Sequence, residues 1–242
     1  MNCTNCKTEV DLNYCPKCGQ PTKLKRIDGH YILHEIEHVL HFERGILYTI
    51  KELIVNPGQN VKSYLVENRS RLVKPVIFII ITSLIYAIAY KIFHFEDAYI
   101  NFNGTEDVSK MPVSIAVFKW LQSNYGYTNM LVSVFMVFWL KLFFRKANYN
   151  FFEILILLCF VLGIGMLIYA FFGIAEGLTG IKTMKVGGIV GLIYSTWAIG
   201  DFFGGKKITK YLKAFASYVL GMLTFILIVM LATVIIDTVI LK

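Results

Sequence analysis

The sequence predicts an all-α fold, a polytopic bundle of transmembrane helices with a small cysteine-rich head at its N-terminal end. Two observations carry this prediction. Only 17% of the 242 residues are charged and 56% are hydrophobic, whereas a soluble domain of this length needs more charge to cover its surface. Four of the five cysteines lie within the first 18 residues. We therefore divide the chain into a head (1–22), a linker (23–72) and a transmembrane body (73–242).

Five apolar segments of the body approach or exceed the roughly 20 residues that cross about 30 Å of hydrocarbon. They are residues 73–93, 129–144, 151–173, 186–203 and 215–241. The second segment is short enough to be re-entrant, although we favour a crossing. The fifth is long enough to tilt or to protrude. The sequence therefore predicts five spans.

Basic residues predict which side of the membrane each connection occupies. They are frequent before Pro75, between the second and third spans, and between the fourth and fifth spans. The two connections contain Lys141, Arg145 and Lys146, and Lys206, Lys207, Lys210 and Lys213. Because cytoplasmic loops are enriched in Lys and Arg, we expect a bacterial inner (plasma) membrane protein with a cytoplasmic N-terminus and its C-terminus outside.

The long connection 95–128 is predicted to lie outside. Its first part is acidic, from Glu96 to Asp107, and carries no excess of positive charge. An apolar stretch, Val113–Leu121, follows. We expect this stretch to form a short helix at the outer surface.

The linker shows apolar residues at helical spacing in Tyr31–Glu43 and Ile46–Val55. Asn56-Pro57-Gly58 interrupts the pattern, and Pro57 is suited to open a further helix that reaches Arg71. Two arrangements remain open. These amphipathic helices either lie on the inner membrane surface or cap the bundle as ordinary cytoplasmic helices.

The head contains two Cys-x-x-Cys pairs, Cys3 with Cys6 and Cys15 with Cys18. Two such pairs, each on a tight turn, place four sulfurs tetrahedrally around Zn²⁺. Four thiolates leave no open coordination position, so the predicted zinc ribbon is structural rather than catalytic. The segment is too short for a core of its own, and zinc would supply most of its folding free energy. Redox-active thiols are the alternative.

Four histidines form one stripe of a predicted helix at spacings of 4, 4 and 3 residues; they are His30, His34, His38 and His41. Such a stripe has three interpretations. It is a polar or interfacial helix face, which we favour, a second metal site, or a sensor of pH or contact with lipid.

The predicted spans carry ionisable residues only at or near their ends: Lys141, Glu153, Glu176, Asp201 and Asp237. A charge near mid-membrane typically marks a transport path or proton relay, and no clear example is present. We expect interfacial end residues, with Asp201 and Asp237 the best candidates for a buried polar role.

Small residues recur at helical spacing in the fourth span, at Gly187, Gly191 and Ser195. Small-xxx-small stripes allow helices to approach closely in membranes. We assign the stripe to packing within the bundle, and a homodimer face is the alternative.

The motifs resemble those of a bacterial family of uncharacterised membrane proteins that carry an N-terminal zinc ribbon. The residues concerned are Cys15-Pro16-Lys17-Cys18-Gly19-Gln20, Asn56-Pro57-Gly58, Tyr64-Leu65 and the tract from Arg69 to Pro75. The resemblance covers roughly residues 15–80 and departs from the family pattern at Glu67-Asn68-Arg69. It implies no activity. The five-span layout is also similar to that of Yip1-type membrane-trafficking proteins, in architecture alone.

These features favour a scaffold or adaptor in the lipid bilayer over an enzyme. We expect the zinc head and basic linker to dock a cytoplasmic protein partner or anionic lipid headgroups. A small transporter or channel is the alternative. A lipid-modifying enzyme ranks third, because no paired carboxylates or activated nucleophile mark a reaction site. Nucleic acid is not an expected partner, because the net charge of +8 follows from the inside bias of the basic residues.

Overall fold

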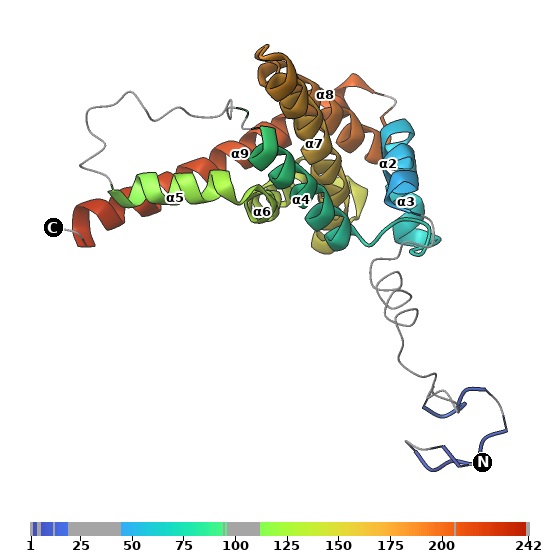
Figure 1. Ribbon diagram of the computed structural model, residues 1–242. Coiled ribbons are helices and arrows are strands. Elements are labelled where there is room, and N and C mark those ends of the chain that lie inside the picture. Colours follow the sequence, from blue (N-terminus) through green and yellow to red (C-terminus); the bar gives the residue numbers. More distant parts are fainter. Residues whose placement is uncertain are drawn as a thin grey trace. The chain divides into compact units, whose positions relative to one another are not determined.

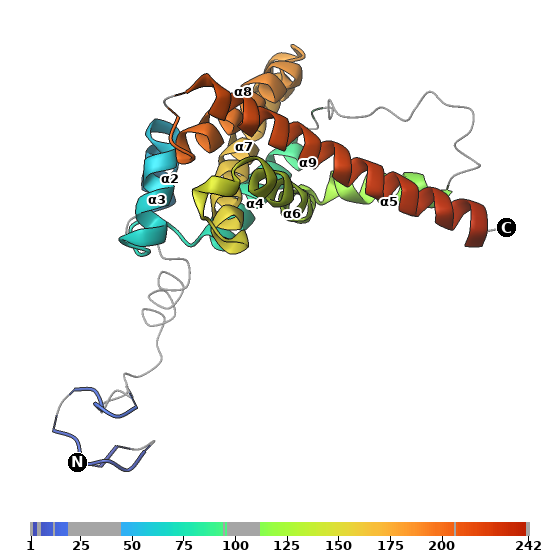
Figure 2. The same cartoon turned by 180° about the vertical axis from the view of Figure 1, so that it is seen from behind.

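The structure is a computed structural model in which the chain forms two compact units, Met1–Glu43 and Arg44–Lys242. The described residues are 2–3, 6–11, 13–18, 45–93, 95, 112–205 and 207–240. The larger unit is built of helices, which confirms the predicted all-α class (Figures 1 and 2). Its elements are α2 (Ile46–Val55), α3 (Pro57–Val66), α4 (Pro75–Phe93), α5 (Pro112–Ser123), α6 (Tyr125–Phe143), the 3-10 turn η3 (Arg145–Ala147), α7 (Phe151–Thr179), α8 (Met184–Phe202), α9 (Ile208–Ile235) and the π-helical turn η4 (Ile236–Ile240).

Three helices of the described chain are long and apolar enough to cross a membrane. They are α4, α7 and the segment Ile208–Thr238, with 19, 29 and 31 residues. A shorter apolar helix, Tyr127–Phe143, stands at the predicted second span. The 19-residue α8 stands at the predicted fourth span but is less apolar than the three. The chain is therefore a multi-pass helical membrane protein, and a total of five crossings stays a prediction.

Helix α4 shows the burial pattern of a membrane span. The residues that repeat every fourth position are large, apolar and about half exposed: Val76, Ile80, Leu84, Ile88 and Ile92. Its polar residues Thr82 and Ser83 are buried on another face. In water such a stripe would be an exposed apolar patch, whereas lipid tails cover it without cost. The pattern supports a lipid-facing stripe on α4.

Helix α7 contacts most of the other elements of the larger unit. It packs against α4, α6 and α8, and also against α2 and α3. Phe160 of α7 is fully buried and meets the Tyr64 ring of α3 edge-on, with centroids 5.4 Å apart. Leu53 of α2 and Val61 of α3 belong to the same core. The two linker helices are thus packed against the apolar body through their buried faces.

Helix α3 is shorter than the predicted helix, which continues to Arg71. It begins at Pro57 as predicted and ends at Val66. Beyond it, the Asn68 side chain accepts hydrogen bonds from the backbone N–H (2.9 Å) and hydroxyl (2.7 Å) of Ser70. Asparagine side chains that bond the backbone two residues ahead stabilise turns over helix. This local turn ends the helix before the basic tract.

The predicted short helix after the acidic segment is present as α5, which lies alongside α9 in both views (Figures 1 and 2). Its first N–H groups bond a carboxylate from the far end of the chain. Asp237 accepts from Val113 N (3.0 Å), Ser114 N (3.0 Å) and Ser114 Oγ (2.7 Å). Because the first four N–H groups of a helix lack partners within it, Asp237 acts as a cap for α5.

We expect Asp237→Ala to destabilise the start of α5 by about 1–2 kcal/mol, the usual cost of losing a helix cap. The substitution leaves the N–H groups of Val113 and Ser114 without this acceptor. Hydrogen exchange at these two amides measures the effect and should accelerate. Ser114→Ala is the matched control, because it removes only the hydroxyl bond and keeps both amide bonds. Equal exchange in Asp237→Ala and wild type would contradict the assignment.

Candidate functional site

The described part of the head brings together the four predicted metal ligands. The sulfurs of Cys3, Cys6, Cys15 and Cys18 all lie within 4.8 Å of one another. Cys3 Sγ lies 3.5 Å from Cys18 Sγ, and Cys6 Sγ lies 3.5 Å from Cys15 Sγ. Each close pair joins one sulfur from each motif. The two motifs therefore converge on one point.

A tight turn shapes the first motif. Lys7 N–H donates to Cys3 O (3.0 Å), and Cys3 N–H donates to Thr8 O (2.9 Å). Lys7 adopts a left-handed φ of 61°, and a bridge between Asn2 and Glu9 closes the loop. In the second motif, residues 16–18 also form a turn. Short turns of this kind bring the two cysteines of a Cys-x-x-Cys motif to the same side.

The first motif favours the thiolate that a metal requires. The hydroxyl and backbone N–H of Thr8 hydrogen-bond the sulfur of Cys6 and lower the pKa of Cys6 to about 6. Hydrogen bonds to a charged group stabilise its ionised form. Cys6 is therefore prepared to bind a cation at neutral pH.

The four sulfurs fit the geometry of a tetrahedral thiolate centre. At a Zn–S distance of about 2.3 Å, the edge of such a tetrahedron is about 3.8 Å, which lies between the shortest and longest separations of the cluster. All four cysteines are free thiols. The fifth, Cys159, is buried in α7 and is not part of the cluster. The predicted histidines His30, His34, His38 and His41 lie outside the described residues.

A second group of polar contacts gathers at the break between α2 and α3. Gly58 N–H donates to Asp201 Oδ2 at the end of α8, at 3.0 Å. Asn56 precedes the helix but makes no cap with its own side chain. A Cβ on Gly58 would lie 2.4 Å from Phe202 N, so α3 approaches the backbone of α8 closely. We call this contact, formed by Pro57, Gly58, Asp201 and Phe202, the α3–α8 junction.

Aromatic rings and hydroxyls extend the α3–α8 junction. The Phe202 ring lies 4.6 Å from the Tyr149 ring, centroid to centroid, and 5.8 Å from Lys62 Nζ. Tyr194 of α8 donates its hydroxyl to Leu53 O of α2, at 3.1 Å. The junction thus joins α2, α3, α8 and the connection before α7.

The basic tract after α3 makes hydrogen bonds to α2. Arg71 donates to Glu52 Oε2 at 2.8 Å and to the Tyr48 hydroxyl at 3.1 Å. Val73 N–H donates to the buried Thr49 Oγ1 at 3.1 Å. Arg71 is partly exposed, so its ion pair contributes little alone, and the tract is fixed by the set of contacts together.

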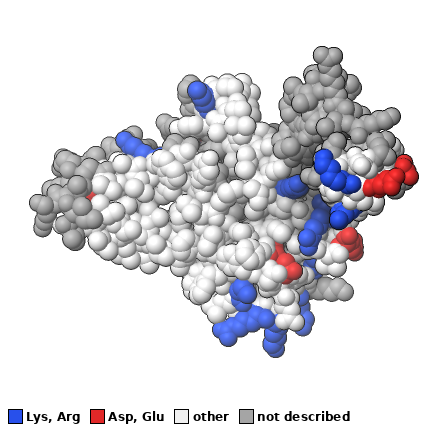
Figure 3. Space-filling model, turned by 90° about the horizontal axis from the view of Figure 1, so that it is seen from below, with Lys and Arg blue, Asp and Glu red and all other residues white. Residues whose placement is uncertain are grey.

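The two basic connections of the body lie next to each other. Lys213 Nζ donates to Phe143 O at 3.2 Å, and the rings of Phe144 and Phe203 stack with centroids 3.9 Å apart. Lys210 donates to Phe203 O and Gly204 O, at 2.7 and 2.8 Å. Both lysines lie within α9, which begins earlier than the predicted fifth span. In Figure 3, a broad expanse of the helical body shows no charged side chain.

Sequence reasoning placed Asp201, Asp237 and Glu176 at helix ends but not their partners. Glu176 Oε2 accepts from the N–H of Met184, the first residue of α8, at 2.8 Å. Each of the three carboxylates thus bonds the first turn of a different helix. The sequence contains only a weak signal for these pairings. Pro57 and Pro112 mark two helix starts, but they do not show which carboxylate bonds each one.

Fold and cluster together define a class, a multi-pass helical membrane protein with a four-cysteine cluster near its N-terminus. A family profile with the description "Protein of unknown function (DUF3667)" matches residues 43–87. This segment contains α2, the Pro57–Gly58 break, the basic tract and most of α4, and it overlaps the second half of the region in which the sequence resembles a family of uncharacterised membrane proteins. No curated protein and no solved structure matches the chain.

Proposed function

We propose that this chain is a non-enzymatic membrane adaptor whose head binds a structural Zn²⁺ and docks a cytoplasmic protein partner. The observation that carries the proposal is the convergence of four thiols within 4.8 Å. Soft thiolate ligands favour zinc among the common divalent metals of proteins. Cys3, Cys6, Cys15 and Cys18 would hold the ion, which supplies folding free energy to the head.

The closed ligand set supports docking rather than catalysis. Catalytic zinc sites keep a position open for water or substrate, whereas four protein ligands fill a structural site. A small zinc-stabilised unit joined by a linker to a membrane body is suited to recruit a partner to the membrane. The basic linker supplies a second attraction, toward anionic headgroups.

The orientation that we propose has five spans, a cytoplasmic N-terminus and the C-terminus outside. The contact between the two basic connections supports it, because both would then lie on the cytoplasmic side. The α3–α8 junction lies beside the same connections, since Phe202 meets Tyr149. In this orientation the linker helices α2 and α3 lie on the cytoplasmic side.

We expect the double substitution Cys15→Ser/Cys18→Ser to abolish recovery of the partner after crosslinking in native membranes. The change removes two of the four ligands, so the head loses its metal and its docking surface. Comparative mass spectrometry of crosslinked material measures the loss. Cys159→Ser is the matched control, because it also removes a thiol but leaves the cluster complete. A partner set that is unchanged in the double variant would contradict the adaptor.

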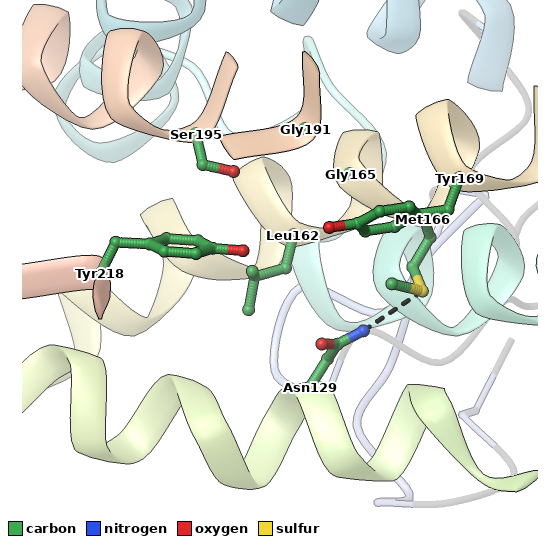
Figure 4. A pocket seen from close by; sticks show the side chains of 8 residues that line it. All are labelled: Asn129, Leu162, Gly165, Met166, Tyr169, Gly191, Ser195 and Tyr218. Atoms are coloured by element: carbon green, nitrogen blue, oxygen red, sulfur yellow. Dashed lines mark hydrogen bonds between the residues drawn. The ribbon is translucent and has the colours of Figure 1, made fainter. Parts of the chain in front are cut away.

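A small transporter or channel is the second candidate. The observation that favours it is a cavity where α6, α7, α8 and α9 meet (Figure 4). At about 20 Å³, this cavity has room for about one water molecule and is too small for a solute path. Flux of an ion or solute into proteoliposomes, equal in wild type and the cysteine variant, would support transport over docking.

The small residues of α8 pack against α7 of the same chain. A Cβ on Gly187 would lie 2.9 Å from Phe172 Cβ, and one on Gly191 would lie 3.4 Å from the Tyr169 ring. These contacts support packing within the bundle as the role of the stripe. A homodimer, if it forms, would use another face.

A further inference from the structure

A small cavity with several polar side chains in its walls lies inside the helical body. Its walls come from four helices: Asn129, Leu162, Gly165, Met166, Tyr169, Gly191, Ser195 and Tyr218. Figure 4 shows the hydroxyls of Tyr169, Tyr218 and Ser195 directed toward a common space, with Asn129 on the opposite wall. The cavity measures about 20 Å³, which exceeds the roughly 10–15 Å³ that one water needs.

Ser195 indicates that this space is not dry. The residue is 2% exposed, and its hydroxyl has no hydrogen-bond partner among the residues that the structure describes. Several buried hydroxyls bond a carbonyl of their own helix, as Ser217 does to Lys213 O (2.8 Å) and Thr82 does to Phe78 O (2.9 Å). The buried hydroxyls of Ser83 and Thr196 also lack a partner within the described residues. Ser195 points into the cavity (Figure 4). Buried polar groups in native proteins nearly always have a partner, which is often an ordered water.

The opposite wall carries a second polar side chain. Asn129 Nδ2 donates to Met166 Sδ at 3.2 Å, and a thioether is a weak acceptor. The amide can also donate to, or accept from, a molecule in the cavity. This wall therefore carries one weak hydrogen bond, whereas Ser195 makes none within the described residues.

Gly165 leaves the space open. A Cβ on this residue would meet no atom within 4 Å, so close helix packing does not require a glycine here. Alanine is the better helix former. Glycine at position 165 in place of alanine therefore has a different effect: it leaves room in the cavity beside Ser195.

We propose that this cavity is a binding site for one ordered water molecule, which bonds the Ser195 hydroxyl of α8 in the space toward which the Tyr169 and Tyr218 hydroxyls are directed (Figure 4). The site does not depend on the zinc head or on the adaptor function. It gives the apolar body a polar contact at the point where four helices meet.

Two substitutions test the water by the sign of a stability change. Gly165→Ala places a methyl group in the cavity and displaces the water, so we expect the Tm of the full-length protein in detergent to fall by about 2–4 °C. In a dry cavity the same methyl would fill a void and improve helix propensity, and the Tm would rise. Ser195→Ala separates the same two cases. If a water is bound, the substitution removes a hydrogen-bonded hydroxyl and the Tm falls. In a dry cavity it removes an unsatisfied buried hydroxyl and the Tm rises. Ser217→Ala is the matched control, with a hydroxyl satisfied by its own helix.

X-ray hydroxyl-radical footprinting gives a second readout, which does not depend on a stability change. Radicals form where water is bound, so Met166 in the wall should be oxidised, and Gly165→Ala should protect it. Met136, which is fully buried at 0% exposure, is the internal reference. A Tm increase in either cavity variant, or protection of Met166 equal to that of Met136 in the wild type, would overturn the proposal.

Discussion

Gly58→Ala is expected to destabilise the membrane body by about 3 kcal/mol or more, at the upper end of the cost of overpacking. The added Cβ would lie 2.4 Å from Phe202 N and 2.5 Å from the backbone C and the Oδ2 of Asp201. Backbone atoms of a packed helix cannot move aside as the tip of a flexible side chain can. The substitution therefore separates α3 from α8 and breaks the bond between Gly58 and Asp201. Heating the detergent-solubilised protein while recording helical circular dichroism measures the loss.

Variants of the other partner show how much of this effect is steric. Asp201→Ala removes the acceptor without a clash and should cost about 1–2 kcal/mol, the usual effect of losing a cap. Asp201→Asn keeps an oxygen acceptor and should cost less. The expected order of destabilisation is Gly58→Ala, then Asp201→Ala, then Asp201→Asn. A Gly58→Ala variant as stable as wild type would show that α3 does not contact α8 in this way.

Removal of zinc is expected to unfold the head and to leave the membrane body folded. Structural zinc sites have apparent binding free energies of about 10–16 kcal/mol in zinc-finger peptides, and a segment this short has little else to stabilise it. The full-length protein should contain one zinc per chain, and Cys15→Ser/Cys18→Ser should contain none. Elemental analysis measures the metal, and limited proteolysis measures folding of the head.

Acidification should release the same metal, because thiolates must take up protons as the ion leaves. The pKa of the metal-free Cys6 thiol is lowered to about 6, and a bound metal lowers the pKa of a coordinating thiol further, so Cys6 is not protonated until the pH falls below about 6. Cobalt substitution offers an optical readout, because its visible absorption reports tetrahedral thiolate coordination. Cys159→Ser should leave metal content unchanged. Protein prepared under reducing conditions that contains no metal would refute the zinc site.

The sequence was sufficient to predict the local features of this fold. Pro57 begins α3 because its fixed φ suits the first position of a helix, and Ile46–Val55 is the range of α2 in both the pattern and the structure. The convergence of the cysteines also follows from local spacing, since two Cys-x-x-Cys motifs separated by a short segment can form one cluster. Hydropathy found α4, α7 and α9 because an apolar run of this length matches the thickness of a bilayer.

The tertiary contacts were not predictable by the same reasoning. Asp201 is 143 residues from Gly58, and no local pattern joins them. An acidic residue at the end of a span is normally satisfied by water and headgroups, so the positions of Asp201 and Asp237 gave no reason to expect a partner within the protein. Ser195 belonged to a stripe of small residues, and its spacing showed neither the cavity nor the direction of its hydroxyl. These features depend on which helices meet, and periodicity does not contain that information.

The carboxylates that cap α3 and α5 come from later segments of the chain, and this affects the order in which the protein matures. At roughly 5–20 residues per second, the 143 residues between Gly58 and Asp201 take on the order of ten seconds to synthesise. The 124 residues between Val113 and Asp237 take a similar time. During that interval α3 and α5 have emerged from the ribosome without the carboxylates that complete them. The first turns of α3 and α5 are therefore completed only after the later helices have been synthesised.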